Sequence, residues 1–114
     1  MYFLVSPRNQ SILQFETLEL ECSVTSLTIF NSTFSWNFTK RGSSTPEHIV
    51  KENESLSSEY SFRFISSNYA SLKIEEVHWK HTGVYTCIVM GGSDMIQAKS
   101  SLNVLSELII ILLS

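Results

Sequence analysis

The sequence has few cysteines, glycines and prolines, no excess of basic residues and no long apolar run. Its 114 residues include 8 Lys and Arg against 11 Asp and Glu, which gives a formal net charge of −3. Nucleic-acid binding needs a basic face and attraction to an anionic membrane needs clustered positive charge, so this balance argues against both as main partners. The hydrophobic fraction of 43% is enough for the core of one small domain.

Only two cysteines are present, Cys22 and Cys87. Two thiols are too few for a structural zinc site without several histidines, and the histidines here have no suitably spaced acids around them. We therefore interpret His78, Trp79 and His81 as solvated turn residues and expect no metal. Two cysteines are enough for one disulfide, which would place the chain in an oxidising compartment.

Catalytic motifs are missing from the sequence. No serine or free cysteine sits in a nucleophile motif beside a plausible base, and no Gly-rich phosphate loop follows a strand. The sequence therefore predicts a non-catalytic domain that needs no cofactor.

The apolar stretches at the two ends are short. Residues 1–5 are shorter than the apolar core of a secretory signal, which has roughly 7–15 residues. Residues 108–113 cannot cross a bilayer, which needs about 20 apolar residues. We interpret residues 106–114 as a short apolar tail that is either the start of a truncated membrane anchor or a hydrophobic extension of a strand.

Apolar and polar residues alternate with a period of two in several short runs, as they do in half-buried strands. The apolar positions of these runs are Leu18, Leu20, Cys22 and Val24; Phe34, Trp36 and Phe38; Leu72 and Ile74; Tyr85, Cys87 and Val89; and Leu102 and Val104. Turn-rich stretches separate the runs, at residues 39–46, 52–58, 66–68 and 91–94. This pattern predicts an all-β sandwich, with one short helical turn within residues 75–81.

Three segments resemble the immunoglobulin superfamily. Residues 18–22 (LELEC) are similar to its second strand, 71–77 (SLKIEEV) to its fifth strand, and 81–87 (HTGVYTC) to its Asp-x-Gly-x-Tyr-x-Cys motif. The resemblance spans about residues 5–105 and implies an immunoglobulin-like β-sandwich of two antiparallel sheets with Greek-key connections. We accordingly expect this domain to occupy residues 1–105.

The resemblance also implies roles for the inward residues. It pairs Cys22 with Cys87 in one disulfide between the sheets and packs Trp36 against that bridge. It makes Tyr85 a tyrosine corner, whose hydroxyl returns to a backbone group, and it places Leu72 in the core of the fifth strand.

The spacing between Trp36 and Arg63 leaves room for two extra short strands, around residues 48–51 and 54–57. That length resembles a variable-type (V-set) domain, which adds such strands to one sheet. An intermediate-type (I-set) domain is the alternative.

The chain departs from the family pattern at three places. His81 stands where the motif has Asp, which in the family pairs with an arginine like Arg63. We therefore expect that ion pair to be lost near neutral pH, and a protonated His81 to repel Arg63. Phe15 replaces the glycine that usually precedes the second strand. The last strand lacks the Phe/Trp-Gly-x-Gly motif of antigen receptors, which argues against that identity.

Four Asn-x-Ser/Thr sequons occur, at Asn9, Asn31, Asn37 and Asn53. Their number indicates a glycosylated domain of the secretory pathway, and the alternative is that Ser/Thr richness creates them by chance. Asn37 follows the inward Trp36, so we expect it to point to solvent from the centre of one sheet. A glycan there would cover the face that such domains often use for docking. Either Asn37 is bare, or binding uses the loops or the opposite sheet.

The connection before the last strand is a candidate ligand loop. It combines glycine freedom with exposed apolar side chains, and its residues are Met90, Gly91, Gly92, Ser93, Asp94 and Met95. An ordinary hairpin is the alternative. Apolar residues at Leu27, Ile29 and Phe30 offer a second recognition loop or a further part of the core.

These features predict an extracellular, non-catalytic recognition domain of a cell-surface receptor or adhesion protein. The expected partner is a protein ligand or another immunoglobulin-type domain, and a homodimer is one form of the second case. We expect the protein to contact the membrane only through an anchor that is missing from this sequence or truncated in it. A secreted soluble binder is one alternative, and an intracellular structural domain with reduced cysteines is another. The receptor hypothesis depends on family analogy.

Overall fold

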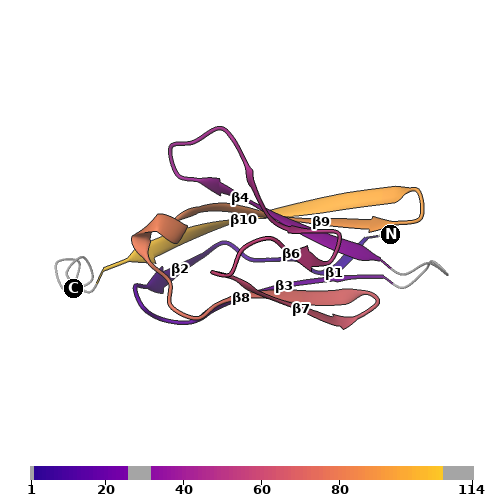
Figure 1. Ribbon diagram of the computed structural model, residues 1–114, viewed down its shortest axis with the longest axis horizontal. Coiled ribbons are helices and arrows are strands. Elements are labelled where there is room, and N and C mark those ends of the chain that lie inside the picture. The colour runs from indigo at the N-terminus through magenta and orange to yellow at the C-terminus, as the bar shows by residue number, and fades with distance from the viewer. Residues whose placement is uncertain (1, 26–31, 107–114) are drawn as a thin grey trace.

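The computed structural model describes residues 2–25 and 32–106, which form two facing β-sheets (Figure 1). The four-stranded sheet has the order β1 (Phe3–Val5), β3 (Leu18–Val24), β8 (Tyr69–Ile74) and β7 (Ser61–Ser66). The six-stranded sheet has the order β2 (Gln10–Leu13), β10 (Asp94–Leu105), β9 (Gly83–Gly91), β4 (Thr33–Lys40), β5 (Glu47–Lys51) and β6 (Glu54–Ser55). The predicted immunoglobulin-like sandwich is confirmed.

One strand pairing is parallel, unlike the purely antiparallel sheets that we expected. The N-terminal segment is divided between the sheets, because β1 pairs with β3 and β2 pairs in parallel with the end of β10. The buried Pro7 lies at the crossing between β1 and β2. Proline has no backbone N–H to donate, so it interrupts the ladder where the chain changes sheet.

The core lies between the sheets and follows the predicted alternation. On β3, Leu18, Leu20, Cys22 and Val24 are all buried, with Glu19 and Glu21 exposed between them. Phe34 and Trp36 on β4 are fully buried, as are the inward residues of β9, which are Tyr85, Cys87 and Val89. The resulting core has apolar side chains from both sheets, which is the usual way that a sandwich buries its inner faces.

A single disulfide joins the two sheets across this core. It links Cys22 on β3 to Cys87 on β9, with the Cα atoms 6.7 Å apart. Trp36 is the residue opposite Cys87 in the register of β4 with β9, and neither side chain has any exposed surface. The bridge and the indole therefore occupy the centre of the sandwich together.

Ser71 differs from its predicted solvent-facing position. It lies opposite Glu21 on β3 and Arg63 on β7, both on the outer face of the four-stranded sheet, yet it has no exposed surface. The small side chain is covered because longer ones flank it on both neighbouring strands. The alternation of apolar and polar residues predicts on which face of the sheet a residue lies. It does not predict whether larger side chains on the neighbouring strands cover that residue.

The two extra strands predicted near residues 48–51 and 54–57 are confirmed as β5 and β6. The predicted helical turn is the 3₁₀ turn η1 (Trp79–His81). Phe15 has a φ of 74°, in the left-handed region, which explains why a glycine is usual there. None of the helices in the described part of the chain is long and apolar enough to span a membrane.

Candidate functional site

The outer face that β10, β9 and β4 form in the six-stranded sheet carries little charge. The registers of β10, β9 and β4 align its outward residues in four rows, and these rows are Met95, Met90 and Thr33; Gln97, Ile88 and Ser35; Lys99, Thr86 and Asn37; and Ser101, Val84 and Thr39. Lys99 is the one charged residue among them. Because charged residues are depleted at the centre of protein interfaces, this face is a candidate docking surface.

The candidate ligand loop is a tight hairpin. Gly91 pairs with Asp94, so only Gly92 and Ser93 form the turn, while Met90 and Met95 lie on β9 and β10. Gly92 has a φ of 61°, as expected for glycine at the first central position of a two-residue turn. Met90 and Met95 are 41% and 61% exposed. An exposed apolar patch is therefore present, but it is held by strands rather than by a flexible loop.

Three sequon asparagines lie within the described residues, and each uses its side-chain oxygen. Asn9 Oδ1 accepts a hydrogen bond from the Ser101 N–H (2.8 Å), and Asn53 Oδ1 accepts one from the Phe34 N–H (2.8 Å). Asn37 Oδ1 lies 2.8 Å from Nδ1 of His48. Asn31, like Leu27, Ile29 and Phe30 of the second predicted loop, lies outside the described residues.

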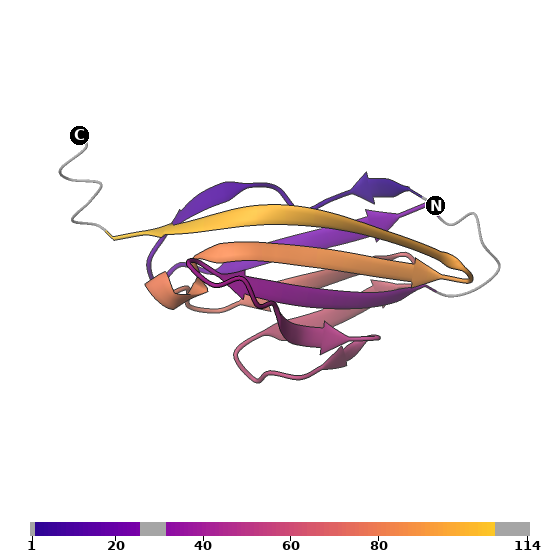
Figure 2. The same ribbon diagram turned by 90° about the horizontal axis from the view of Figure 1, so that it is seen from above.

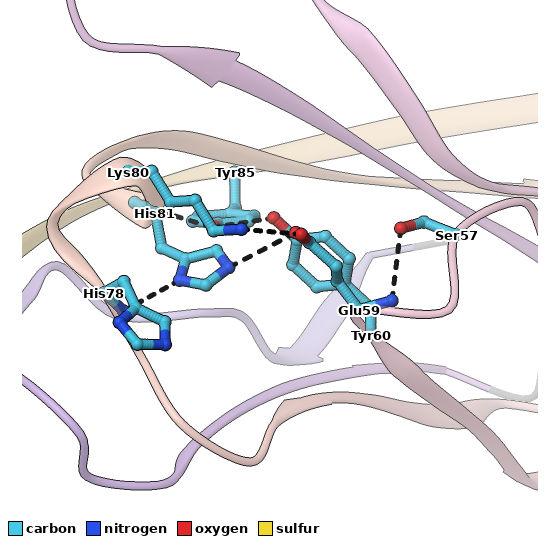
Figure 3. A network of polar contacts seen from close by, with 7 residues as sticks. All are labelled: Ser57, Glu59, Tyr60, His78, Lys80, His81 and Tyr85. Carbon is cyan, nitrogen blue, oxygen red and sulfur yellow. Dashed lines mark hydrogen bonds and ion pairs between the residues drawn. The ribbon is translucent and has the colours of Figure 1, made fainter.

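At the opposite end from the β9–β10 hairpin, a network of polar side chains surrounds η1 (Figures 1 and 3). The Tyr85 hydroxyl donates to the His81 carbonyl oxygen at 3.1 Å, which is the geometry of a tyrosine corner. The Tyr60 hydroxyl lies 3.3 Å from that of Tyr85. Burial raises the pKa of Tyr60 to about 12 and raises the pKa of Tyr85 as well, so both hydroxyls keep their protons.

Two expectations about His81 are wrong. It is only 3% exposed rather than solvated, whereas Trp79 is 68% exposed. Its neighbour is Glu59, whose Oε2 lies 3.6 Å from His81 Nε2, and not Arg63, which lies further along β7 opposite Ser71. Glu59 Oε1 also accepts a hydrogen bond from Lys80 Nζ at 2.7 Å. A histidine therefore stands at the position of the family's aspartate, and its acidic partner is Glu59 rather than a residue at the position of the family's arginine.

The hydrogen bonds define the protonation state of His81. The His78 backbone N–H donates to His81 Nδ1 at 2.9 Å, so Nδ1 is unprotonated and the ring proton is on Nε2, toward Glu59 (Figure 3). Burial lowers the pKa of His81, and the nearby Glu59 carboxylate only partly opposes this effect. The hydrogen bond from Lys80 lowers the pKa of Glu59. At neutral pH the corner is therefore held by a neutral histidine and a Glu59–Lys80 ion pair.

Acidification is expected to destabilise the domain in two stages. The folded-state pKa of His81 is lower than the unfolded value of 6.5, so the unfolded chain binds that proton first and stability falls as pH drops below about 6.5. Glu59 stabilises the fold above its unfolded pKa of 4.5, and this contribution is lost as pH falls through its lower folded pKa. Urea unfolding at a series of pH values measures both stages. In His81→Gln the first stage should shrink, and an unchanged profile would contradict this assignment.

Tyr85→Phe is expected to lower the free energy of unfolding by about 2 kcal/mol, because it leaves the buried His81 carbonyl and the Tyr60 hydroxyl without their shared partner. Thermal or urea unfolding gives the value. Tyr60→Phe is the matched control, since it removes only the hydroxyl–hydroxyl contact and should cost less. A larger loss in the control would show that the corner is held by the segment before β7 rather than by β9.

No group of three or more potential metal-binding residues occurs in ranges 2–25 and 32–106. The signal for the Glu59–His81 contact was present in the sequence as an acid and a histidine near two expected strand ends. The two residues come into contact only through the tertiary fold, which places the segment before β7 beside η1.

Residues 5–105 match the family model described as immunoglobulin V-set domain. Among solved structures, the chain is similar to one in the titin M10–obscurin-like 1 Ig complex, with 21% identity, a TM-score of 0.69 and coverage of 92% of this chain and 93% of that one. It is also similar to the RIG-5 IG1 homodimer, with 16% identity, a TM-score of 0.71 and coverage of 90% of this chain and 94% of that one. Identities this low show a shared fold only. No curated protein matches the chain at a significant level.

Proposed function

The chain belongs to the immunoglobulin V-set family, and we propose that it is the extracellular recognition domain of a cell-surface receptor or adhesion protein. Its partner is a protein ligand or another immunoglobulin-type domain, and it carries out no chemistry of its own. Proteins of this fold serve in many settings, so the location is argued from the residues rather than from the fold.

The disulfide between Cys22 and Cys87 is the observation that carries the proposal. Both cysteines are fully buried, and the bond joins the two sheets at the centre of the core. Such a bond persists in the secretory pathway and outside the cell, whereas the cytosol keeps thiols reduced. Four sequons, three of them on the described surface, agree with the same compartment.

The hairpin end of the six-stranded sheet is the recognition surface that this proposal assigns. Met90, Met95 and Ile88 gather there, next to rows of small polar residues. Exposed methionines adapt their shape to different partners, and low charge limits the cost of desolvation. A glycan on Asn37 would leave this end accessible, because Asn37 lies two rows further along β4.

Expression of the complete gene in its native cell type tests the location. We expect non-reducing peptide mapping to find Cys22 linked to Cys87, and enzymatic removal of N-glycans to lower the apparent mass of the protein at the cell surface. Recovery of the glycosylated protein from the medium alone would favour the secreted alternative. Free thiols together with bare sequons would overturn the proposal in favour of an intracellular structural domain.

A second experiment tests the recognition surface. Met90→Asp and Met95→Asp should each abolish binding of a dimeric fusion of the domain to cells that display the partner. Glu76→Ser, at an exposed position between β8 and η1 and outside both outer sheet faces, is the control for this readout and should preserve binding. Undiminished binding by both Asp variants would exclude the hairpin end.

A further inference from the structure

The described sequons all lie on one side of the sandwich. Asn9 precedes β2, Asn37 is in β4 and Asn53 lies between β5 and β6, all on the six-stranded sheet. No residue of β1, β3, β8 or β7 belongs to a sequon. If the glycans are attached, which depends on the proposed function, the four-stranded sheet keeps a bare outer face.

That outer face is divided into an acidic half and a basic half. The registers place Glu19 and Glu21 on β3, and Lys73 and Arg63 on the two strands beyond it, β8 and β7. Glu19 is opposite Lys73, and Glu21 is in the same row as Ser71 and Arg63. Lys73 also lies 3.3 Å from Glu75, with both side chains accessible to solvent.

Apolar side chains flank the charges at both edges of this sheet. Leu4 and Val5 on β1 are 60% and 45% exposed, and Ile65 on β7 is 46% exposed. Val5 is paired with Ser23, which lies in the row of Tyr69 and Ser66. Ile65 precedes Ser66, so the two apolar edges are at the same height along the strands.

We propose that this face binds a second copy of the chain, around a two-fold axis that runs along the strands between β3 and β8. Such an axis places β3 over β8 of the second copy and β1 over its β7, and it keeps each row level. Glu19 then faces Lys73 of the second copy, and Glu21 comes close to its Arg63. Leu4 and Val5 meet Ile65 of the second copy at each edge.

The charge pattern selects this arrangement over others. A two-fold axis across the strands would lay β3 on β3, with acid against acid. A partner of one charge sign would be attracted by one half of the face and repelled by the other. A face split into opposite halves is complementary to its own rotated copy, as an isologous interface requires. Because the charges are accessible to solvent, we expect a weak dimer that dissociates further at high salt.

Complementary charge reversal is the decisive experiment. The oxidised 114-residue chain, freed of N-glycans, should show a monomer–dimer equilibrium by analytical ultracentrifugation. Glu19→Lys with Glu21→Lys, and separately Arg63→Glu with Lys73→Glu, should each raise the dimer Kd at least tenfold. An equimolar mixture of the two variants should recover the dimer as a heterodimer. A monomeric wild-type chain at millimolar concentration, or a mixture that stays monomeric, would overturn the proposal.

New glycans give an independent test on the glycosylated protein. Tyr69→Asn creates a sequon with Ala70 and Ser71 on β8, and Lys99→Asn creates one with Ser100 and Ser101 on β10. The glycan on β8 should abolish dimerisation, while the one on β10 should preserve it. The reverse result would place the interface on the six-stranded sheet. Free thiols in native cells would contradict the proposed extracellular location but not the dimer interface. A glycosylated protein that stays monomeric would contradict the dimer interface but not the location.

Discussion

Replacement of both cysteines, as Cys22→Ala with Cys87→Ala, is expected to lower the free energy of unfolding by at least about 4 kcal/mol. The bond closes a loop between residues 65 positions apart, so its loss gives the unfolded chain many additional conformations. Both cysteine side chains are fully buried, so the substitution also removes packing around Trp36. Urea unfolding with separate fluorescence and circular dichroism probes measures the change and tests whether unfolding remains a single transition.

Reduced wild-type protein separates the two contributions. It retains the buried sulfur atoms but loses the cross-link, so it should lose most of the stability and remain more stable than the double Ala variant. If reduction changed the free energy of unfolding by less than about 1 kcal/mol, the sandwich would be held by its core alone. The fold would then offer no reason for the chain to reside in an oxidising compartment.

The strands of the core could be predicted from the sequence because each has one buried and one exposed face. Leu18, Leu20 and Cys22 alternate with glutamates, and this period of two is a local property of the chain. The cysteines, Trp36 and Tyr85 fall on inward positions of separate strands, so their spacing indicates the sandwich before any contact is known. Two extra strands could be expected from the number of residues available between Trp36 and Arg63.

The polar corner could not be predicted in the same way. Arg63 and Glu59 are four residues apart, and the choice between them depends on where β7 begins and on how it pairs with β8. Because β7 starts at Ser61, Glu59 lies before the strand and turns toward η1, while Arg63 faces outward within it. The same limit applies to Ser71, whose burial depends on two neighbouring strands, and to the division of charges between β3 on one side and β8 and β7 on the other.

The structure distinguishes the two interpretations of residues 90–95, a recognition loop and an ordinary hairpin, in favour of the hairpin. Gly91, Gly92 and Ser93 lie between two alternating runs, a pattern that favours a two-residue turn. A flexible recognition loop over residues 90–95 would have required unpaired backbone. Instead the pairing of Gly91 with Asp94 extends both strands to the end of the domain, as the long β10 shows (Figure 2). Recognition at this end would therefore use a rigid surface, which costs less entropy on binding than an ordered loop.

Gly83→Ala is expected to lower the free energy of unfolding by about 3 kcal/mol, although it adds a single methyl group. A Cβ at this position would lie 2.3 Å from the Thr39 carbonyl oxygen and 2.7 Å from Cε1 of Phe38. Gly83 is where β9 begins, paired with Lys40 on β4 and with Leu102 on β10. The contact is with backbone, so relief requires β4 and β9 to move apart just before Tyr85 and Cys87. This close approach gives a physical reason for the glycine in the tyrosine-corner motif.

Gly42→Ala is the matched control for this prediction. Gly42 has a φ of 84° and open space around its Cα, so alanine there incurs only the conformational cost of about 1 kcal/mol. Both variants are compared by urea unfolding of the oxidised protein. Gly83→Ala should lose clearly more stability, and it should also weaken the tyrosine corner, so a further Tyr85→Phe substitution should cost less in this variant than in the wild type. Equal losses in the two glycine variants would mean that backbone conformation alone, and not the contact between β4 and β9, requires glycine at position 83.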